Sequence, residues 1–410
     1  MKEVMKLKRT NLLFIIATIT LMLLTCIPTS TSNTEITETD ADTRVIASFD
    51  PRTYPLQIIY DSERNLVYIA LYAYRYSGGQ LYANQCGIVI VNVTKVILNE
   101  SDFYTVKIPP IPPALTNGTG RFVALDEYGR IWIRISYENM YQGWANLTCY
   151  DLNTDTWHIS KIPVKDNTAI YYKGYLWCVG TLEYNNYLLK VDVSGSEPVI
   201  VQKYYIPGGI YSIKGKDNYL WISVINKNKL YKFNIETGLI EKSATLNSPC
   251  GIDFKDGKVY VAESYLYTDY QPDNGTIAVL NETTCELLTR IETARLTVGG
   301  VREVLIDSAG VLWYTDQSDH VGMISLLMNK TFKAFGDACY YMAEVPGASV
   351  WFTSKGSAHL EAVESPIVAL DVNIETANLG EVSLLGTYPV SYTHLRAHET
   401  SLHLVCRLLL

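Results

Sequence analysis

A short apolar segment centred on an aromatic residue recurs seven times along the chain, and each copy follows a turn. The starts of successive copies are 38 to 64 residues apart. Repeats of roughly 40–50 residues that carry several short strands are typical of β-propeller blades, which bury their faces only by stacking on neighbours. We therefore predict an all-β fold, a seven-bladed β-propeller of four-stranded antiparallel blades spanning residues 44–389. The copies are VYIAL, IWIRI, LWCVG, LWISV, VYVAE, LWYTD and VWFTS, and they begin at Val67, Ile131, Leu176, Leu220, Val259, Leu312 and Val350.

The fourth copy shows how each repeat extends into a full blade. Its aromatic segment YLWISV is preceded by IYSIK and the turn GKDN, and it is followed by the loop INKN. The segment KLYKFN, the turn ETG and the segment LIEKSATL complete the unit. Alternating apolar residues separated by Gly, Asn and Asp turns indicate an antiparallel meander. We expect negligible helix beyond the N-terminal segment.

The sequence leaves open how the ring closes. The strand-like segment RVIASF (44–49) lies before the first blade, and EVSLL (381–385) lies near the other end. Either segment suits the outer strand of the seventh blade. We assign PIVALDV (366–372) as the third strand of that blade, which places His359 in an insertion before it.

Both ends of the chain differ from the repeats. Residues 1–32 combine a basic start with an apolar run, which predicts a signal peptide or membrane anchor, and residues 33–43 form a Thr/Ser-rich tether. Residues 390–410 resemble a translated sequencing adapter, so we expect the natural chain to continue past Pro389. We predict an extracytoplasmic protein, secreted or anchored at the cell surface. Contact with a membrane is expected only through the N-terminal segment or a C-terminal anchor beyond Pro389.

The charge of the chain argues against nucleic acid as a partner. The formal net charge is −8, and removing the basic residues 1–32 and the weakly basic residues 390–410 leaves a still more acidic body without a basic patch. Seven N-x-S/T sequons are consistent with an exported glycoprotein. They begin at Asn92, Asn99, Asn117, Asn146, Asn274, Asn281 and Asn329. Six cysteines outside the two end segments permit disulfides, but equally suit buried apolar positions, and their pairing stays open. They are Cys86, Cys149, Cys178, Cys250, Cys285 and Cys339.

The fifth and sixth repeats carry the most specific motifs. SPCGIDFKDGKVYVAES (248–264) and LIDSAGVLWYTDQSDHVGMIS (305–325) resemble the streptogramin lyase (virginiamycin B lyase) propeller family, over roughly residues 56–372. The resemblance implies a magnesium-dependent lyase with a general-base histidine and a glutamate at the end of the following strand. Glu263 occupies the glutamate position, whereas Cys250 stands where the family has histidine. Because a neutral thiol does not replace an imidazole as proton acceptor, we expect no streptogramin cleavage.

Carboxylates near the predicted channel give an alternative, enzymatic function. Oxygen ligands suit Mg²⁺ or Ca²⁺, so a metal-dependent lyase or lactone hydrolase using Glu263 as catalytic residue is the second hypothesis. Alternatively, these carboxylates are ordinary surface residues that bind no metal. The candidate metal ligands are Asp253, Glu263, Glu303 and Asp316.

Aromatic residues concentrate in the predicted loops between the second and third strands. Such loops share one face of a propeller, and amphipathic rings on a rigid scaffold suit the binding of sugars or peptides. The first hypothesis is therefore a binding module for a glycan, a peptide or an envelope protein, although the chain is rich in tyrosine throughout, with 31 in all. The predicted ligand-binding residues are Tyr74, Tyr137, Tyr141, Trp144, Tyr184, Tyr265, Tyr267 and Asp269.

Overall fold

The computed structural model describes the chain between Asp40 and Glu364, within the unit that begins at Glu38. Residues 1–39, 42, 52, 74–86, 111–115, 120–121, 138–144, 166–167, 183–184, 266–273, 296–299, 317–319, 326–329, 336–338, 346–348, 356 and 365–410 lie outside the description. The predicted signal peptide or anchor, nearly all of the tether, and the adapter-like segment therefore stay predictions. Among the described residues, no helix is long and apolar enough to cross a membrane.

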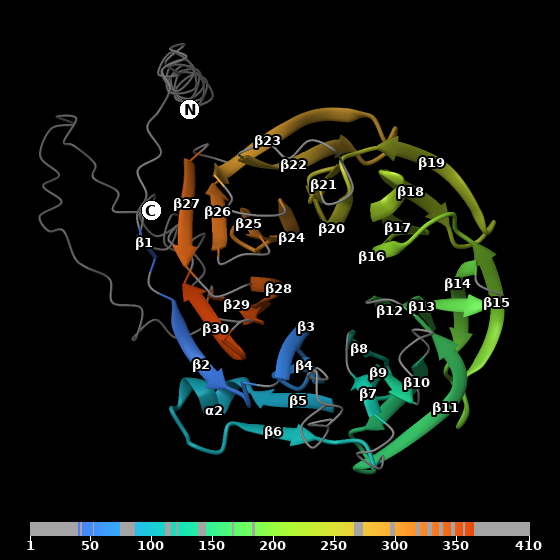
Figure 1. Cartoon of the computed structure of the whole chain (residues 1–410), viewed down its shortest axis with the longest axis vertical. Helices are drawn as coiled ribbons and strands as arrows, with labels where there is room; N and C mark the ends of the chain where they lie inside the picture. Colours follow the sequence, from blue (N-terminus) through green and yellow to red (C-terminus); the bar gives the residue numbers. More distant parts are fainter. Residues whose placement is uncertain are drawn as a thin grey trace, which may run out of the picture. The chain divides into compact units, whose positions relative to one another are not determined.

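Seven β-sheets surround a central axis, each with one strand at the centre and one at the rim (Figure 1). We number these blades one to seven along the chain. Blade one contains β3 (Thr53–Asp61), β4 (Leu66–Ala73), β5 (Gly87–Asn92) and β6 (Tyr104–Lys107). Blade two contains β7 (Thr116–Thr119), β8 (Ala124–Leu125), β9 (Arg130–Tyr137), β10 (Ala145–Asp151) and β11 (Thr156–Val164). Blade three contains β12 (Ala169–Tyr172), β13 (Tyr175–Leu182), β14 (Asn185–Asp192) and β15 (Val199–Tyr205).

The second half of the ring repeats this order. Blade four contains β16 (Ile210–Lys216), β17 (Tyr219–Val224), β18 (Lys229–Asn234) and β19 (Leu239–Thr245). Blade five contains β20 (Pro249–Lys255), β21 (Lys258–Glu263), β22 (Asn274–Asn281) and β23 (Leu287–Arg295). Blade six contains β24 (Val301–Ile306), β25 (Val311–Asp316), β26 (His320–Ser325), β27 (Lys330–Phe335) and the added strand β1 (Asp40–Ala41). Blade seven contains β28 (Cys339–Val345), β29 (Ser349–Ser354), β30 (His359–Glu364) and β2 (Arg44–Ser48).

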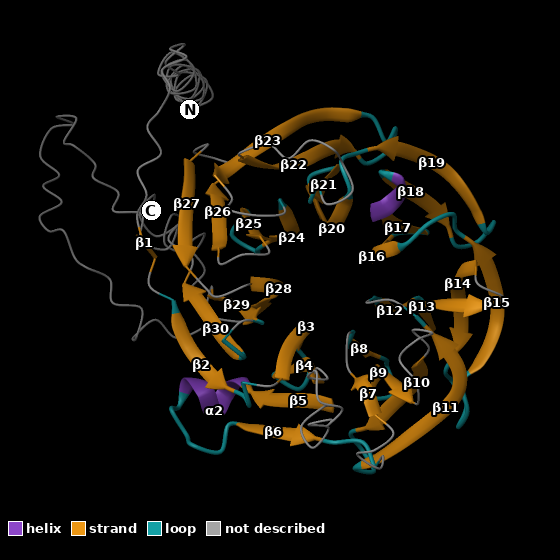
Figure 2. Ribbon diagram, in the orientation of Figure 1, coloured by secondary structure: helices purple, strands orange, loops and turns teal. Residues whose placement is uncertain are grey.

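The predicted fold class is confirmed, and each of the seven aromatic segments lies in the second strand of its blade. Two sheets carry a fifth strand: β7 and β8 both pair with β9, and β1 pairs in parallel with β27. Helix within the described residues is limited to α2 (Val93–Ile97) and the 3₁₀ turn η4 (Ile225–Lys227), as Figure 2 shows.

The two ends of the ring meet in blade seven. Strand β2 pairs antiparallel with β30, with Arg44 opposite Ala362 and Ser48 opposite His359, so the earlier of the two candidate segments closes the ring. The assignment of PIVALDV as the third strand is wrong, as is the placement of His359 in an insertion. Only residues 355–358 separate β29 from β30, and Ser354 lies directly opposite His359. The charges of HLEAVE obscured this strand, although Glu361 is buried within it.

The core of the ring lies between the blades and not within them. Seven apolar clusters are present among the described residues, and each contains side chains from two adjacent blades. Trp132 packs toward blade three, for example, whereas Trp313 packs toward blade seven. Because every blade depends on both neighbours for burial, closure by β2 stabilises the whole ring.

An aspartate fixes the turn between the first two strands of three blades. Asp307 Oδ1 accepts the backbone N–H of Val311 at 2.8 Å, while its Oδ2 accepts the indole N–H of Trp313 at 2.8 Å. Asp126 and Asp61 make the equivalent bonds to Trp132 Nε1 and to the Tyr68 hydroxyl, at 2.8 and 3.1 Å. One carboxylate therefore closes the turn and satisfies the polar atom of the large ring in the core.

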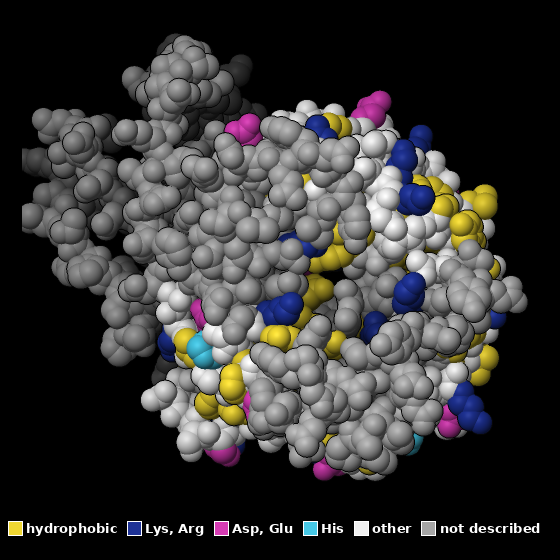
Figure 3. Space-filling view, viewed as in Figure 1, with side chains coloured by type: hydrophobic (Ala, Val, Ile, Leu, Met, Phe, Trp, Pro, Cys, Tyr) yellow, Lys and Arg dark blue, Asp and Glu magenta, His cyan; other side chains and the backbone are white. Residues whose placement is uncertain are grey.

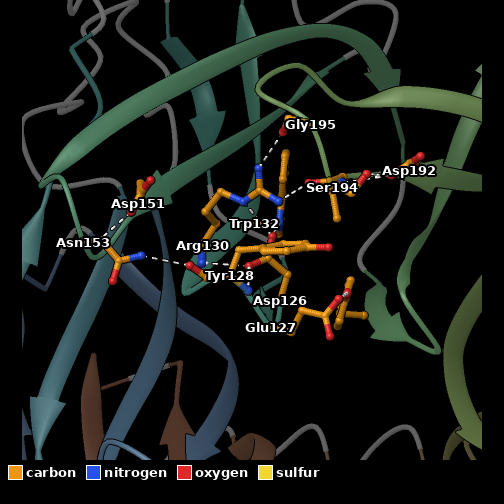
Figure 4. A network of polar contacts seen from close by, with 12 residues as sticks. Asp126, Glu127, Tyr128, Arg130, Trp132, Asp151, Asn153, Asp192, Ser194 and Gly195 are labelled. Carbon is orange, nitrogen blue, oxygen red and sulfur yellow. Dashed lines mark hydrogen bonds and ion pairs between the residues drawn. The ribbon is translucent and has the colours of Figure 1, made fainter.

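In blade two this arrangement extends to the next blade (Figure 4). Arg130 Nε donates to Asp126 Oδ2 at 2.8 Å, and its Nη1 donates to the carbonyl of Gly195 in blade three at 3.0 Å. The hydroxyl of Tyr171 donates to Glu127 Oε1 at 2.8 Å across the same boundary. These contacts couple the turn of one blade to the position of its neighbour.

Replacing Asp307 with alanine is expected to destabilise the fold by about 2–4 kcal/mol, because Trp313 Nε1 and the Val311 N–H lose their acceptors inside the core. Urea unfolding followed by tryptophan fluorescence measures the change. Ser308→Ala is the control, since the Ser308 side chain is exposed in the same turn. Equal stability of the two variants would contradict the assigned role of Asp307.

Candidate functional site

The two faces of the ring differ in charge. We call the turn face the side formed by the connections between first and second strands and between third and fourth strands. The loop face is formed by the connections between second and third strands and from one blade to the next. Exposed acids of the turn face include Glu63, Glu127, Asp155, Glu197, Asp217 and Asp256. The connections of the loop face carry acids as well, namely Asp50 and, outside the described residues, Glu138, Asp166, Glu183, Asp269, Asp273, Asp319 and Asp337.

Basic residues lie on the loop face in three blades. Lys165 precedes β12, Lys227 lies in η4 and Lys355 follows β29. Arg302, the second residue of the inner strand β24, is buried. Figure 3 views the ring along its axis and shows a central opening bordered by hydrophobic, Lys and Arg side chains, with most of the visible Asp and Glu side chains at the rim.

An aromatic pair stands at the start of the inner strand of blade one. Tyr54 and Tyr72 are cross-strand partners in β3 and β4, and their rings stack with centroids 6.3 Å apart and an interplanar angle of 18°. Lys355 reaches over from blade seven, with Nζ 5.0 Å from the centre of the Tyr54 ring. Tyr54 remains partly exposed, so this group offers an aromatic surface next to a cation.

Further charged groups lie on the inner strands of blades four to six. Lys214 Nζ is 3.1 Å from Asp253 Oδ1, and Asp253 Oδ2 accepts the N–H of Ile306 at 2.7 Å. Arg302 Nη1 donates to Cys250 Sγ at 3.8 Å, and its guanidinium carbon lies 5.8 Å from the centre of the Tyr211 ring. These contacts join three adjacent blades at the channel wall.

Glu303 occupies space that a glycine leaves for it. A Cβ at Gly251 would approach Glu303 Oε1 to 2.2 Å, so only glycine fits there without displacement. Burial raises the pKa of the Glu303 carboxyl to about 8, although Lys214 and the Val304 N–H oppose the rise and Asp253 adds to it. The neutral form of Glu303 consequently prevails at neutral pH.

The structure places the predicted catalytic Glu263 inside the protein. Its Oε1 accepts the N–H of Asn247 at 2.8 Å, and its Oε2 accepts the Thr276 hydroxyl at 2.6 Å. Arg290 bonds both oxygens, at 2.8 and 3.1 Å. With its side chain fully enclosed and these four donors in place, Glu263 acts as the acceptor of a structural ion pair.

The four candidate metal ligands are not gathered into one centre. Glu263 is bound to Arg290, and Asp253 is bound to Lys214. Asp316 is fully enclosed at the end of β25. Among the residues that the structure describes, no group of three or more His, Cys, Asp or Glu side chains is arranged to hold a metal ion.

Tyr265 also belongs to the interior around Glu263. Its ring is buried, and its hydroxyl lies 2.7 Å from the Thr276 hydroxyl, next to the ion pair. The side chains of the other predicted ligand-binding residues are not described, although the backbone of Tyr137 ends strand β9, and their role stays a prediction. They are Tyr74, Tyr137, Tyr141, Trp144, Tyr184, Tyr267 and Asp269.

The side chains of four of the six cysteines are described, and all four are free thiols in the core: Cys149, Cys178, Cys250 and Cys285. Burial raises the pKa of the Cys149 and Cys178 thiols to about 12. It also raises the pKa of Cys250. A thiol held in its protonated form is not a proton acceptor.

Sequence reasoning missed Tyr54, Arg302 and Lys355 as parts of the site. Each lies at the loop-face end of a strand, next to a strand of another blade, and no local motif distinguishes it. The one available signal was a basic residue or tyrosine beside the start of an inner strand. That signal becomes informative only when the positions of the blades are known.

The fold defines the chain as a seven-bladed β-propeller, and comparison of structures supports this class. The ring resembles the Pan2 WD40 domain of Neurospora crassa at 10% identity and a TM-score of 0.56, covering 80% of this chain and 97% of that domain. It resembles the WD40 propeller domain of Doa1 at 9% identity and a TM-score of 0.55, covering 79% and 97%. It resembles the AfRom2 CNH domain at 9% identity and a TM-score of 0.53, covering 79% of this chain and 99% of that domain. No family model and no curated protein sequence matches the chain.

The carboxyl of Glu303 is expected to make stability depend on pH. The unfolded chain loses this proton near pH 4.3, whereas the folded chain keeps it until about pH 8, so stability falls as pH rises between these values. Glu303→Gln, which stays neutral, should therefore be more stable than the parent protein at about pH 9, by on the order of a few kcal/mol, and similar at about pH 4. Urea unfolding at both pH values measures this, with the exposed Glu63→Gln as control. Parallel pH curves for Glu303→Gln and the parent protein would contradict it.

Proposed function

We propose that this chain is an exported interaction module that binds a peptide, a glycan or an envelope protein on the loop face of its propeller. The observation that carries the proposal is the group of Tyr54, Tyr72 and Lys355 beside the central opening. Stacked aromatic rings on paired strands lose little conformational freedom on binding, and an adjacent cation adds a directional contact. The enclosed ion pair of Glu263 supports a binding function over catalysis at that residue.

The greater acidity of the turn face also favours the loop face as the binding side of the ring. Several acids of the opposite face close their own turns. The carboxylates of Asp151 and Asp192 accept the backbone N–H groups of Asn153 and Ser194. The loop face instead presents rings and basic side chains near the opening, together with the predicted aromatic loops. Concave or ringed surfaces with aromatic anchors are where propellers and other rigid scaffolds place their binding residues.

Export is supported by the basic and apolar N-terminal segment and by the seven sequons. If the protein is exported in a host that glycosylates asparagine, endoglycosidase treatment should increase its electrophoretic mobility. Asn99→Gln should remove one glycan, since Asn99 is exposed after α2. An unchanged mobility, together with protection from protease added to intact cells, would place the protein inside the cell.

Binding is tested by probing arrays of peptides and glycans with the full-length chain. Tyr54→Ala is expected to weaken binding of the captured ligands by about tenfold, because the exposed ring of the stack is removed. Tyr205→Ala is the matched control, since that tyrosine is exposed on the outer strand β15. Unchanged binding by Tyr54→Ala and by the combined loop variant with Tyr74, Tyr141 and Tyr267 changed to Ala would move the function away from this face.

A further inference from the structure

The outer strands of blades three and four carry exposed apolar side chains. They are Val199, Val201 and Tyr205 in β15 and Leu239 and Ile240 in β19, with exposed fractions from 38% to 64%. The structure describes the chain without a gap from residue 186 to residue 265, which includes both strands. Figure 3 shows hydrophobic side chains at the edge of the ring where Figure 1 places these strands. We call these five side chains the rim patch.

The two strands contribute to one continuous surface. A Cβ at Gly238 would approach Tyr204 Cε1 to 2.6 Å, so the turn before β19 packs against the end of β15. Tyr205 and Leu239 follow these two residues directly in the chain. Tyr204 itself packs edge-on against Phe233, with ring centroids 4.8 Å apart. The apolar side chains of β15 and β19 therefore lie along the same part of the rim.

Strand β15 also has an open edge. It is the last strand of its sheet, and no strand among the described residues pairs with its outer side. The N–H and C=O groups of such an edge are a template for a further strand. The rim of blade six shows that an outer strand of this ring accepts one, because β1 pairs in parallel with β27.

The other outer strands have features that protect an edge from further pairing. Strand β27 is covered by β1, β6 and β2 have only four and five residues, and β11 contains Pro163. Strand β19 carries two charged residues and β23 carries three. Strand β15 has seven residues, no proline and a single charge, that of Lys203. A bulge at Val201, which β19 shares in the corresponding place, leaves Gln202–Tyr205 as the regular part of its edge.

The sequence keeps this part of the rim clear of glycosylation sites. All seven sequons lie at or before Asn146, or at or after Asn274, so blades three and four have none. The exposed leucines of β23 in blade five, by contrast, closely follow the sequon at Asn281. If the other blades carry glycans, as the proposed export implies, the rim patch stays accessible to a large partner.

We propose that the rim patch is the contact surface of a symmetric dimer in which β15 pairs with β15 of a second copy. A two-fold axis brings the same patch of both copies together, so apolar side chains meet apolar side chains. Lys203 is the only charged residue of β15, and it lies opposite its own copy only in the register centred on it. In every other register Lys203 faces an uncharged residue.

The symmetry also sets the orientation of the two rings. Two equal strands that pair side by side about a two-fold axis run antiparallel. Because β15 runs from the turn face to the loop face, the two loop faces of the dimer point in opposite directions. Dimerisation through the rim patch therefore leaves both loop faces open, and the inference goes beyond the proposed binding function without depending on it.

Sedimentation velocity of the full-length chain tests the dimer. The mass of two chains is expected to appear as the protein concentration is raised from about 1 to 100 μM. The double variant Val199→Lys/Val201→Lys should weaken dimerisation by about tenfold or more, because three lysines of each copy then meet at the contact. A mass of one chain at every concentration, or an unchanged dimer in this variant, would overturn the inference.

The matched control makes the same chemical change on another outer strand. Leu287 and Leu288 of β23 are 41% and 51% exposed, so Leu287→Lys/Leu288→Lys also places two lysines on the rim. This variant is expected to dimerise like the parent protein. An equal loss of the dimer would show that added charge alone separates the chains, and it would refute the assigned surface.

Hydrogen exchange of the backbone amides identifies the strand that pairs. The amides of Gln202–Tyr205 should exchange more slowly at a concentration that favours the dimer, whereas those of β23 should not change. In Val199→Lys/Val201→Lys the exchange of β15 should be independent of concentration, with the amides of β14 protected as in the parent protein if the blade is folded. A dimer whose β15 amides exchange at the same rate as in the monomer would place the contact elsewhere and contradict the pairing.

Discussion

Every blade of this ring depends on its neighbours to cover its apolar faces. A four-stranded sheet is too small to bury both faces alone, and the seven clusters of the core each span two blades. The large rings of the second strands fill these boundaries, with Trp132, Trp177, Trp221 and Trp313 almost completely buried. Closure of the ring by β2 is a consequence of the same requirement, since an open seventh blade would expose the cluster shared with blade one.

The buried rings bring polar atoms into the core, and the turn aspartates satisfy them. Asp126 and Asp307 each serve a tryptophan and a turn at once, so the sequence pattern of aspartate before the aromatic segment has a physical cause. Blade three meets the same demand differently, with Trp177 Nε1 donating to the carbonyl of Tyr172 at 3.2 Å. Because these turns lie on one side of the ring, their acids also give the turn face its charge. The loop face, where we propose that binding occurs, is therefore separate from the turn aspartates that stabilise the blades.

Charged residues near the channel illustrate how position changes the role of a side chain. Glu263 of blade five is held by Arg290, whereas Glu303 of blade six lies beside Gly251 and makes no ion pair with the residues that the structure describes. The first is a structural acceptor, whereas the second favours its neutral form because burial raises its pKa to about 8.

The sequence by itself determined the number of blades and the identity of the second strands, because periodic apolar segments and Gly or Asp turns are local signals. Blade four agreed with prediction to within two residues at each strand end. It did not determine the closing strand, and it misplaced the third strand of blade seven, because pairing between distant segments has no local signature and Glu361 disguised a buried strand. The role of Glu263 depended on Arg290, which lies two strands away. The grouping of Tyr54 with Lys355 was likewise decided by the tertiary structure, since only the stacking of blades brings such residues together.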